Sequence, residues 1–208
     1  MPFTPVDHPV IEAAMARLRD KRTPCDQIRR ECHRVSLVLA EAATKSLPTA
    51  PMSIQTVLGT AHCKTLFGET VLVPIMRAGD GMKEAFLTFL PDSLVCHVSI
   101  SRDHETHAPI FRGSTVPPTV NPEHTYFVLD PMLATGGSAS HAIAHLKHAG
   151  ATKIIFVGIL GCPTGIVRLE RDHPDVQVYI ANIDPELNAD AYIVPGLGDM
   201  GDRLFPTC

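Results

Sequence analysis

The chain has 208 residues, and the 45% of them that are hydrophobic can bury a full core, so we expect a single domain over residues 1–208. A formal net charge of −4 offers no basic surface to nucleic acid, which leaves a small molecule as the expected partner. The six cysteines stand singly without zinc-site spacing, and neither a secretion signal nor a membrane-length apolar run is present. We therefore expect a cytoplasmic protein with no metal held by its own side chains, no nucleic-acid partner and no membrane contact.

Two helices are expected at the start of the chain. Apolar residues recur at helical spacing over residues 11–18 and again over residues 28–43. In the second helix the Thr23 hydroxyl is expected to cap the first turn, while the Asp26 carboxylate complements the positive end of the helix. We expect this helix to end near Thr44.

Downstream, short apolar runs alternate with segments of helical spacing, which predicts an α/β fold with a mostly parallel central sheet flanked by helices. The expected strands are Thr70–Ile75, Leu94–Ile100, Thr125–Leu129, Lys153–Leu160 and Val176–Ala181. The expected helices between them are Gly81–Leu90, Ser138–Ala149 and Thr164–Arg171. Gly150 should stop the second of these helices.

Three passages show no regular pattern. Leu47–Met52 is rich in Pro, Ser and Thr, and both Ser101–His124 and Asp184–Cys208 are long and irregular. Long irregular loops in compact proteins are often functional, so we expect the last two passages to contact a ligand.

The strongest functional signal is the segment DPMLATGGS (Asp130–Ser138), which joins the predicted strand Thr125–Leu129 to a helix. The first amides of a helix carry a partial positive charge, and Gly136 and Gly137 let an anion approach the backbone closely. Neither a Walker loop nor a dinucleotide-binding turn is present. The pattern indicates a phosphate cradle in which Asp130 binds ribose hydroxyls, with a simple tight turn as the alternative.

Three segments together carry a resemblance to a known family. DPMLATGGS is similar to the signature with which type I phosphoribosyltransferases bind phosphoribosyl pyrophosphate (PRPP), in the Asp-Pro form of the uracil phosphoribosyltransferases. Pro74–Met82 resembles the pyrophosphate loop of that family, and Tyr192–Arg203 resembles its uracil-binding segment. With HPDV at 173–176, the resemblance covers nearly the whole chain. It implies the type I phosphoribosyltransferase fold, with N-terminal helices and a small C-terminal hood.

The resemblance also assigns site residues by position. As catalytic residues it implies Arg77, Arg102 and Asp199. PRPP is expected to contact these three residues and the run Asp130, Pro131, Met132, Leu133, Ala134, Thr135, Gly136, Gly137 and Ser138. Uracil is expected to contact Ile193, Gly198, Asp199 and Met200, mainly through main-chain groups. For Arg77 and Arg102 a surface position at a strand end is the alternative, and for Asp202 we favour a solvated turn carboxylate.

The implied reaction transfers the phosphoribosyl group of PRPP to a ring nitrogen of uracil, giving uridine monophosphate (UMP) and pyrophosphate, a step of pyrimidine salvage. Mg²⁺ is expected as a cofactor bound mainly through PRPP, with GTP as an effector and a homodimer or higher homo-oligomer as the assembly. Two other interpretations stay open. One is a non-catalytic paralogue that binds PRPP or a nucleotide, and the other is a phosphoribosyltransferase for a different base.

Four residues depart from the family pattern, namely Glu41, Asp80, Ser101 and Met200, and they bear on catalytic efficiency and base preference. Asp80 places a carboxylate in the pyrophosphate loop. We expect it to cap the helix that follows, the alternative being a repulsion that weakens PRPP binding.

Five histidines are candidate metal ligands. His141, His145 and His148 share one predicted helix, but no acidic or cysteine ligand accompanies them there. We therefore expect a hydrated polar face, and the same for His104 and His107 in the loop that is expected to close over the site.

Overall fold

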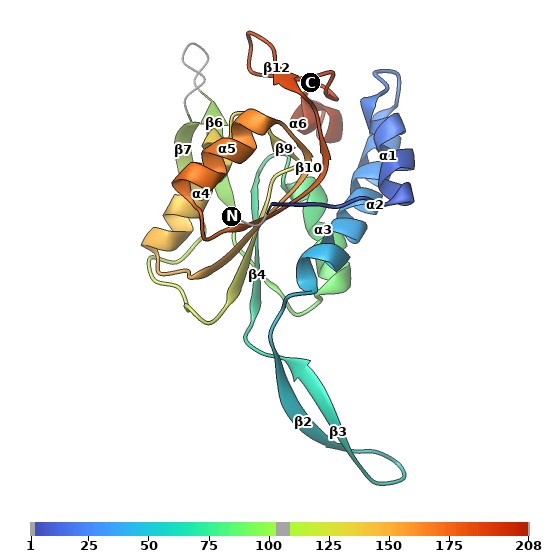
Figure 1. The fold of residues 1–208 in the computed structure, drawn as a ribbon, viewed down its shortest axis with the longest axis vertical. Helices are drawn as coiled ribbons and strands as arrows, with labels where there is room; N and C mark the ends of the chain where they lie inside the picture. The colour runs from blue at the N-terminus through green and yellow to red at the C-terminus, as the bar shows by residue number, and fades with distance from the viewer. Residues whose placement is uncertain (1–2, 103–108, 208) are drawn as a thin grey trace.

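A mostly parallel sheet forms the centre of the protein (Figure 1). The computed structural model describes residues 3–102 and 109–207, leaving out the side chain of Arg102. The strand order is β1-β11-β10-β8-β4-β6-β7, and only the β6–β7 pair within this described sheet is antiparallel. These strands are Phe3–Pro5, Gln177–Ile183, Lys153–Gly161, Thr125–Leu129, Thr70–Met76, Val98–Arg102 and Pro109–Ser114. The short strands β5 (Leu94–Val95) and β9 (Met132–Leu133) pair with β4 and β10.

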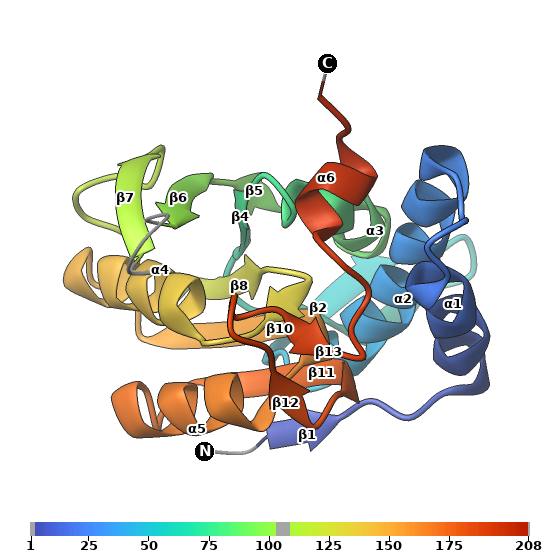
Figure 2. The same cartoon turned by 90° about the horizontal axis from the view of Figure 1, so that it is seen from above.

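Helices cover both faces of the sheet (Figure 2). On one face lie α1 (Pro9–Arg19), α2 (Cys25–Thr44), α3 (Asp80–Phe89) and α6 (Met200–Leu204). On the other lie α4 (Gly137–His148) and α5 (Pro163–Asp172). Because both faces are covered, the central strands are continuous apolar runs, and all five residues of β8 are buried.

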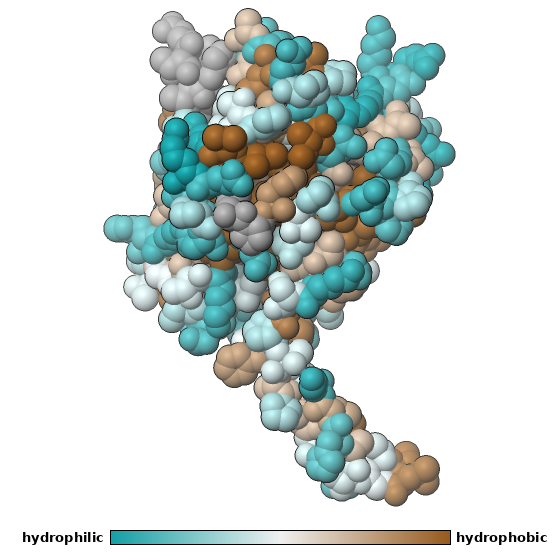
Figure 3. Space-filling view, in the orientation of Figure 1, coloured by the Kyte–Doolittle hydropathy of each residue, from teal (hydrophilic) through white to brown (hydrophobic). Residues whose placement is uncertain are grey.

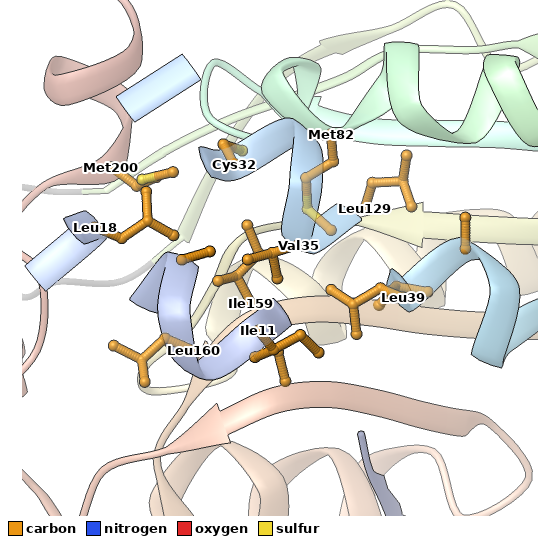
Figure 4. Packing of buried hydrophobic residues seen from close by; sticks show 14 of the residues in the cluster. Ile11, Leu18, Cys32, Val35, Leu39, Met82, Leu129, Ile159, Leu160 and Met200 are labelled. Atoms are coloured by element: carbon orange, nitrogen blue, oxygen red, sulfur yellow. The ribbon is translucent and has the colours of Figure 1, made fainter. Parts of the chain in front are cut away.

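Successive side chains of each strand enter opposite cores, as the pleat of a strand requires. In β8, Phe127 and Leu129 pack with α1, α2 and α3, whereas Tyr126 and Val128 pack with α4 and α5. Figure 4 shows the first core, where side chains of α1 and α2 meet Leu129 and the β10 residues Ile159 and Leu160. The shared edge of the strand ends is set by the pairing, since β10, β8 and β4 run parallel and their carboxyl ends lie together.

The predicted fold class is confirmed, and the predicted strands and helices exist with small shifts at their ends. The predicted strand Leu94–Ile100 divides into β5 and β6. Gly150 stops α4 as expected, with a φ of +107°. The cap at Thr23 was wrong. Pro24 holds the N-cap position of α2 without a side-chain bond, and the Thr23 hydroxyl instead donates to the carbonyl of Arg17 at 2.7 Å.

The passages expected to be irregular contain structure that the prediction missed. Ser101–His124 includes β7, and Asp184–Cys208 includes β12 (Glu186–Leu187), β13 (Ile193–Val194) and α6. We call residues 184–207 the hood. Histidines 104 and 107, and most of the loop expected to close over the site, lie outside the described residues.

A two-stranded antiparallel hairpin projects away from the body of the protein (Figures 1 and 3). It consists of β2 (Thr49–Gln55) and β3 (Thr60–Leu66), joined by a turn that Thr56 and Gly59 close with a 2.8 Å backbone bond. We call residues 49–66 the arm. None of its residues is fully buried.

No helix in the described part of the chain is both long and apolar enough to cross a bilayer.

Candidate functional site

The segment predicted to be a phosphate cradle, residues 130–138, lies between the end of β8 and the start of α4, and we call it the cradle. Gly136 occupies the N-cap position of α4 with φ 74° and ψ 0°, a left-handed conformation that favours glycine. The Gly137 amide donates to the Thr135 hydroxyl at 3.4 Å. The first amides of a helix have no partner within it, so the amides at the start of α4 are oriented toward this end of the sheet. The local geometry is that of an anion-binding helix start.

The first residues of the cradle form a turn that follows β8 and bonds to the backbone of β10. The Asp130 carboxylate accepts a 3.2 Å bond from the Met132 amide, and the Pro131 carbonyl accepts the amides of Ile159 and Leu160. Pro131, Leu133 and Ala134 are buried. Of the PRPP-binding residues assigned by resemblance, these three therefore offer main-chain groups rather than side chains to a ligand.

Arg77 lies at the end of β4, next to the end of β8, because Pro74 pairs with Leu129 in the sheet. A side chain on Gly79 would collide with the carbonyl oxygen of Leu129, so glycine allows the loop after β4 to pack against the start of the cradle. Arg77 Nη2 lies 2.6 Å from Asp202 Oδ1 in the hood. The structure thus brings together three segments that the resemblance had assigned to one site.

The hood contains Tyr192–Arg203, the segment that resembles a uracil-binding site. Ile193 is buried in β13 and pairs with Leu187 of β12, and Gly198 adopts a φ of +80°. Asp199 caps α6, since its Oδ1 accepts the Asp202 amide at 2.9 Å. The Met200 side chain is buried in the core near Leu18 (Figure 4), so it is not available to a ligand.

A family model described as uracil phosphoribosyltransferase matches residues 5–207. The chain belongs to the uracil phosphoribosyltransferase family. A relative of that name from Alkaliphilus oremlandii is 43% identical over 205 residues and covers 98% of both chains. Another from Thermus thermophilus is 42% identical over 208 residues and covers 100% of both.

Two solved structures resemble the fold of this chain. The AQ2163 protein from Aquifex aeolicus matches with a TM-score of 0.91 at 32% identity, over 98% of this chain and 97% of that one. Orotate phosphoribosyltransferase from Mycobacterium tuberculosis, solved in complex with PRPP, matches with a TM-score of 0.50 at 12% identity, over 84% of this chain and 88% of that one. The second likeness shows the shared type I phosphoribosyltransferase fold.

Two arginines attach the hood to the N-terminal helices, and the sequence did not predict them. Arg19 on α1 forms two 2.7 Å bonds to the Asp184 carboxylate and a 2.9 Å bond to the Gly196 carbonyl. Burial would raise the pKa of Asp184, but the bonds from Arg19 and the Gly196 amide outweigh burial and lower it. Arg203 donates to the carbonyls of Leu18, Asp20 and Leu197. Such pairs join residues too far apart in the chain for spacing to reveal them.

The structure also corrects the interpretation favoured for Asp202, that it is only a solvated turn carboxylate. Its side chain is 63% exposed, yet it is the ion-pair partner of Arg77. A carboxylate this close to an arginine of the pyrophosphate loop orients the guanidinium.

The expected helix cap at Asp80 was wrong. Asp80 is the first residue of α3, Gly79 holds the N-cap position, and the Asp80 side chain makes no cap bond. Its carboxylate lies 3.0 Å from Lys83 Nζ and 3.4 Å from His97 Nε2. The hydrogen bond with Asp80 is the main cause that raises the pKa of Lys83. The carboxylate charge is therefore balanced by neighbours on the protein.

The other departures from the family pattern have plain structural surroundings. Glu41 is exposed on α2 and pairs with Lys45 at 3.0 Å. Ser101 accepts a 2.8 Å bond from Arg112 Nε across the β6–β7 pair. Arg102 is the last residue of β6, and its side chain lies outside the described residues.

The histidines of α4 are not uniformly hydrated, which corrects the expected polar face. Phe111 of β7 packs on His141 and His145, with ring centroids 5.7 Å and 5.0 Å apart. Burial, assisted by the neighbouring histidines, lowers the pKa of His145. His148 is exposed. Within residues 3–102 and 109–207, no group of three or more His, Cys, Asp or Glu side chains is arranged to hold a metal ion.

Proposed function

We propose that the chain transfers the phosphoribosyl group of PRPP to uracil and releases pyrophosphate. The observation that carries this proposal is the convergence of three segments at one edge of the sheet. The cradle follows β8, Arg77 follows the adjacent β4, and the hood reaches Arg77 through Asp202. The names of the full-length relatives support uracil as the base.

In the proposed arrangement the cradle residues 130–138 hold the 5′-phosphate and ribose of PRPP. Arg77 and Arg102 bind the pyrophosphate, and Asp199 faces the junction of PRPP and base. Main-chain groups of Ile193, Gly198 and Met200 read the polar edge of uracil. Preset main-chain donors and acceptors suit a small planar base because they do not rearrange when it binds.

The chemistry is a displacement at the anomeric carbon of PRPP. A bond forms from a ring nitrogen of uracil to that carbon, the bond from the carbon to the pyrophosphate oxygen breaks, and the proton of the nitrogen is finally released to solvent. Negative charge grows on the departing pyrophosphate, so the guanidinium groups of Arg77 and Arg102 stabilise the transition state. Closure of the loop after Arg102 would exclude water, which otherwise hydrolyses PRPP.

Magnesium belongs to the same proposal as part of the substrate. Mg²⁺ in phosphoryl sites keeps several waters and takes much of its coordination from substrate oxygens. Two carboxylates at the pyrophosphate loop already have cationic partners, Arg77 for Asp202 and Lys83 for Asp80. These surroundings suit an ion that enters with PRPP. Titration of activity with Mg²⁺ at fixed PRPP tests whether the reaction requires the ion. Full activity in excess chelator would contradict a requirement for Mg²⁺.

Pyrophosphate release from PRPP, measured with uracil and with a panel of other bases, tests the proposed reaction. Release that requires uracil supports it. Release with another base alone would indicate a phosphoribosyltransferase for that base, and binding of PRPP without release would indicate a non-catalytic paralogue.

The proposal includes a homodimer or higher homo-oligomer assembled through the arm. Side chains on one face of the arm are mostly apolar, with Met52 opposite Cys63 and Ile54 opposite Ala61, and Met52 is 47% exposed. At the tip, Val57 and Leu58 are fully exposed (Figure 3). An isolated two-stranded hairpin is at best marginally stable in water, and exposed apolar surface of this kind marks contact sites.

A second copy of the chain is the occupant we assign to the arm, since most homo-oligomers are closed and symmetric. Size-exclusion chromatography with light scattering tests it on the wild type and on a variant with Met52→Ser and Ile54→Ser. The control changes Ser53→Ala and His62→Ala on the opposite, polar face of the arm. We expect the first variant to lose mass and the control to keep it, and a monomeric wild type would refute the assembly.

GTP as an effector and a cytoplasmic location complete the proposal. Activity at subsaturating PRPP with and without GTP tests the first. The described cysteines, Cys25, Cys32, Cys63, Cys96 and Cys162, are free thiols, which supports the second.

A further inference from the structure

An arginine on α5 lies beside the phosphate cradle. A Cβ placed on Gly137 would lie 3.3 Å from Arg168 Nη1 and 3.5 Å from Thr135 Oγ1. A Cβ placed on Gly136 would lie 3.4 Å from the Cβ of Arg168. The Arg168 side chain therefore runs along the two glycines, and its guanidinium ends in the space that the missing side chain of Gly137 leaves open.

The guanidinium of Arg168 is incompletely bonded by protein groups. Its Nε is shielded from solvent and makes no hydrogen bond within the described structure. The nearest carboxylate oxygen, Asp172 Oδ2, lies 3.4 Å away, an ion-pair distance without hydrogen-bond geometry. Asp172 takes shorter bonds from Arg171 Nε at 2.8 Å and Ser140 Oγ at 3.0 Å. Arg168 thus keeps donors for another acceptor.

A pocket of about 560 Å³ opens beside this arginine. Its lining joins α5 to the cradle and consists of Thr135, Pro163, Thr164, Val167, Arg168 and Arg171. Helices α4 and α5 lie on the same face of the sheet (Figure 2). An anion at the start of α4 would accordingly meet a helix N-terminus, a hydroxyl and a guanidinium at one place.

We propose that Arg168 binds the 5′-phosphate of PRPP, and of UMP, together with the first amides of α4 and the Thr135 hydroxyl. The guanidinium offers a rigid fork of donors that matches phosphate oxygens. The inference rests on the proposed function. It extends that function to α5, from which the sequence resemblance assigned no site residue.

The test compares UMP with pyrophosphate, two ligands that occupy different parts of the proposed site. UMP carries the 5′-phosphate and no pyrophosphate, whereas pyrophosphate binds at the Arg77 side of the site. Calorimetric binding of each ligand is measured for the wild type, Arg168→Gln and Arg168→Lys. Lys147→Gln is the matched control, because it removes one positive charge from α4 and breaks an ion pair, with Asp175, outside the pocket lining.

We expect Arg168→Gln to weaken UMP binding roughly tenfold, because a charge-assisted bond is lost, while pyrophosphate binding changes less than about twofold. Arg168→Lys should recover part of the loss, and Lys147→Gln should bind UMP nearly as the wild type does. Unchanged UMP binding by Arg168→Gln would overturn the inference, as would an equal loss for both ligands. Failure of the wild type to bind UMP at all would instead overturn the proposed function.

Discussion

Gly136 and Gly137 are neighbours in the cradle, and the structure predicts that replacing them has different consequences. At Gly137 we predict that valine obstructs the phosphate without unfolding the protein. A Cβ there would meet the Arg168 guanidinium end at 3.3 Å and Pro109 Cδ at 3.5 Å, and the former can move aside. The branched side chain would occupy the approach to the Gly137 amide.

The size of the effect follows from the bonds at risk. Losing one charge-assisted bond to phosphate costs about 1.5–3 kcal/mol, so the Michaelis constant for PRPP should rise roughly tenfold or more, or turnover should vanish. The melting temperature should fall by no more than a few degrees, because the replaced position contacts a flexible side chain.

Gly136→Ala is the contrasting variant. Its φ of 74° disfavours alanine by about 1–2 kcal/mol, and a Cβ would press on the Gly165 carbonyl oxygen of α5 at 2.9 Å, which is backbone and cannot easily move. A total of about 2–3 kcal/mol corresponds to a melting temperature lower by about 4–12 °C in a chain of this size.

Steady-state kinetics with varied PRPP and thermal melts on all three proteins decide the matter. An unchanged Michaelis constant for PRPP in Gly137→Val would remove the cradle from the site. A Gly136→Ala protein as stable as the wild type would refute the argument from backbone strain.

Three further predictions concern charged residues. Arg102→Ala should lower kcat/KM by about one to two orders of magnitude through loss of a pyrophosphate contact, and a loss below twofold would place Arg102 outside the site. Asp80→Leu should destabilise the protein by about 1 kcal/mol, because Lys83 loses the shorter of its two ion pairs, while calorimetry finds PRPP affinity nearly unchanged. Tighter PRPP binding would instead show that the Asp80 carboxylate repels PRPP. Asp184 has a lowered pKa in the folded protein, so its ionised form stabilises the fold above its ordinary value of 3.8 and loses that effect as pH falls through the lower folded value. The stability deficit of Asp184→Asn in melts should therefore be largest near neutral pH and shrink in acid, and a deficit independent of pH would contradict this assignment.

The central fold was predictable because its signals are local. Strand β8 reads as an unbroken apolar run only because α2 and α3 cover one face and α4 and α5 the other. The end of α4 was predictable from Gly150 alone, because the positive φ that commonly ends a helix favours glycine. Structure that is determined within one turn or one strand can be predicted from the sequence alone.

The interior of the candidate site was less predictable because its contacts are distant in the chain. Arg77 and Asp202 are 125 positions apart, and Arg19 and Asp184 are 165 apart. The spacing of residues within one segment does not indicate a partner so far away in the chain. The resemblance indicated which segments converge, but not that Asp202 would bond to Arg77 or that Arg168 would lie against Gly137.

For the arm, the sequence does contain a local strand pattern, but the strand was not predicted from it. Met52 and Ile54 alternate with Ser53 and Gln55, the period of a half-buried strand. Pro51 and the surrounding Ser and Thr residues favoured a loop instead, although proline is tolerated in an edge strand. An alternating strand needs something to cover its apolar face, and the sheet core of the described chain does not do so for Met52, which stays 47% exposed. The alternation therefore predicts a partner surface as much as a strand, which is the physical reason to test the arm for contact with a second copy.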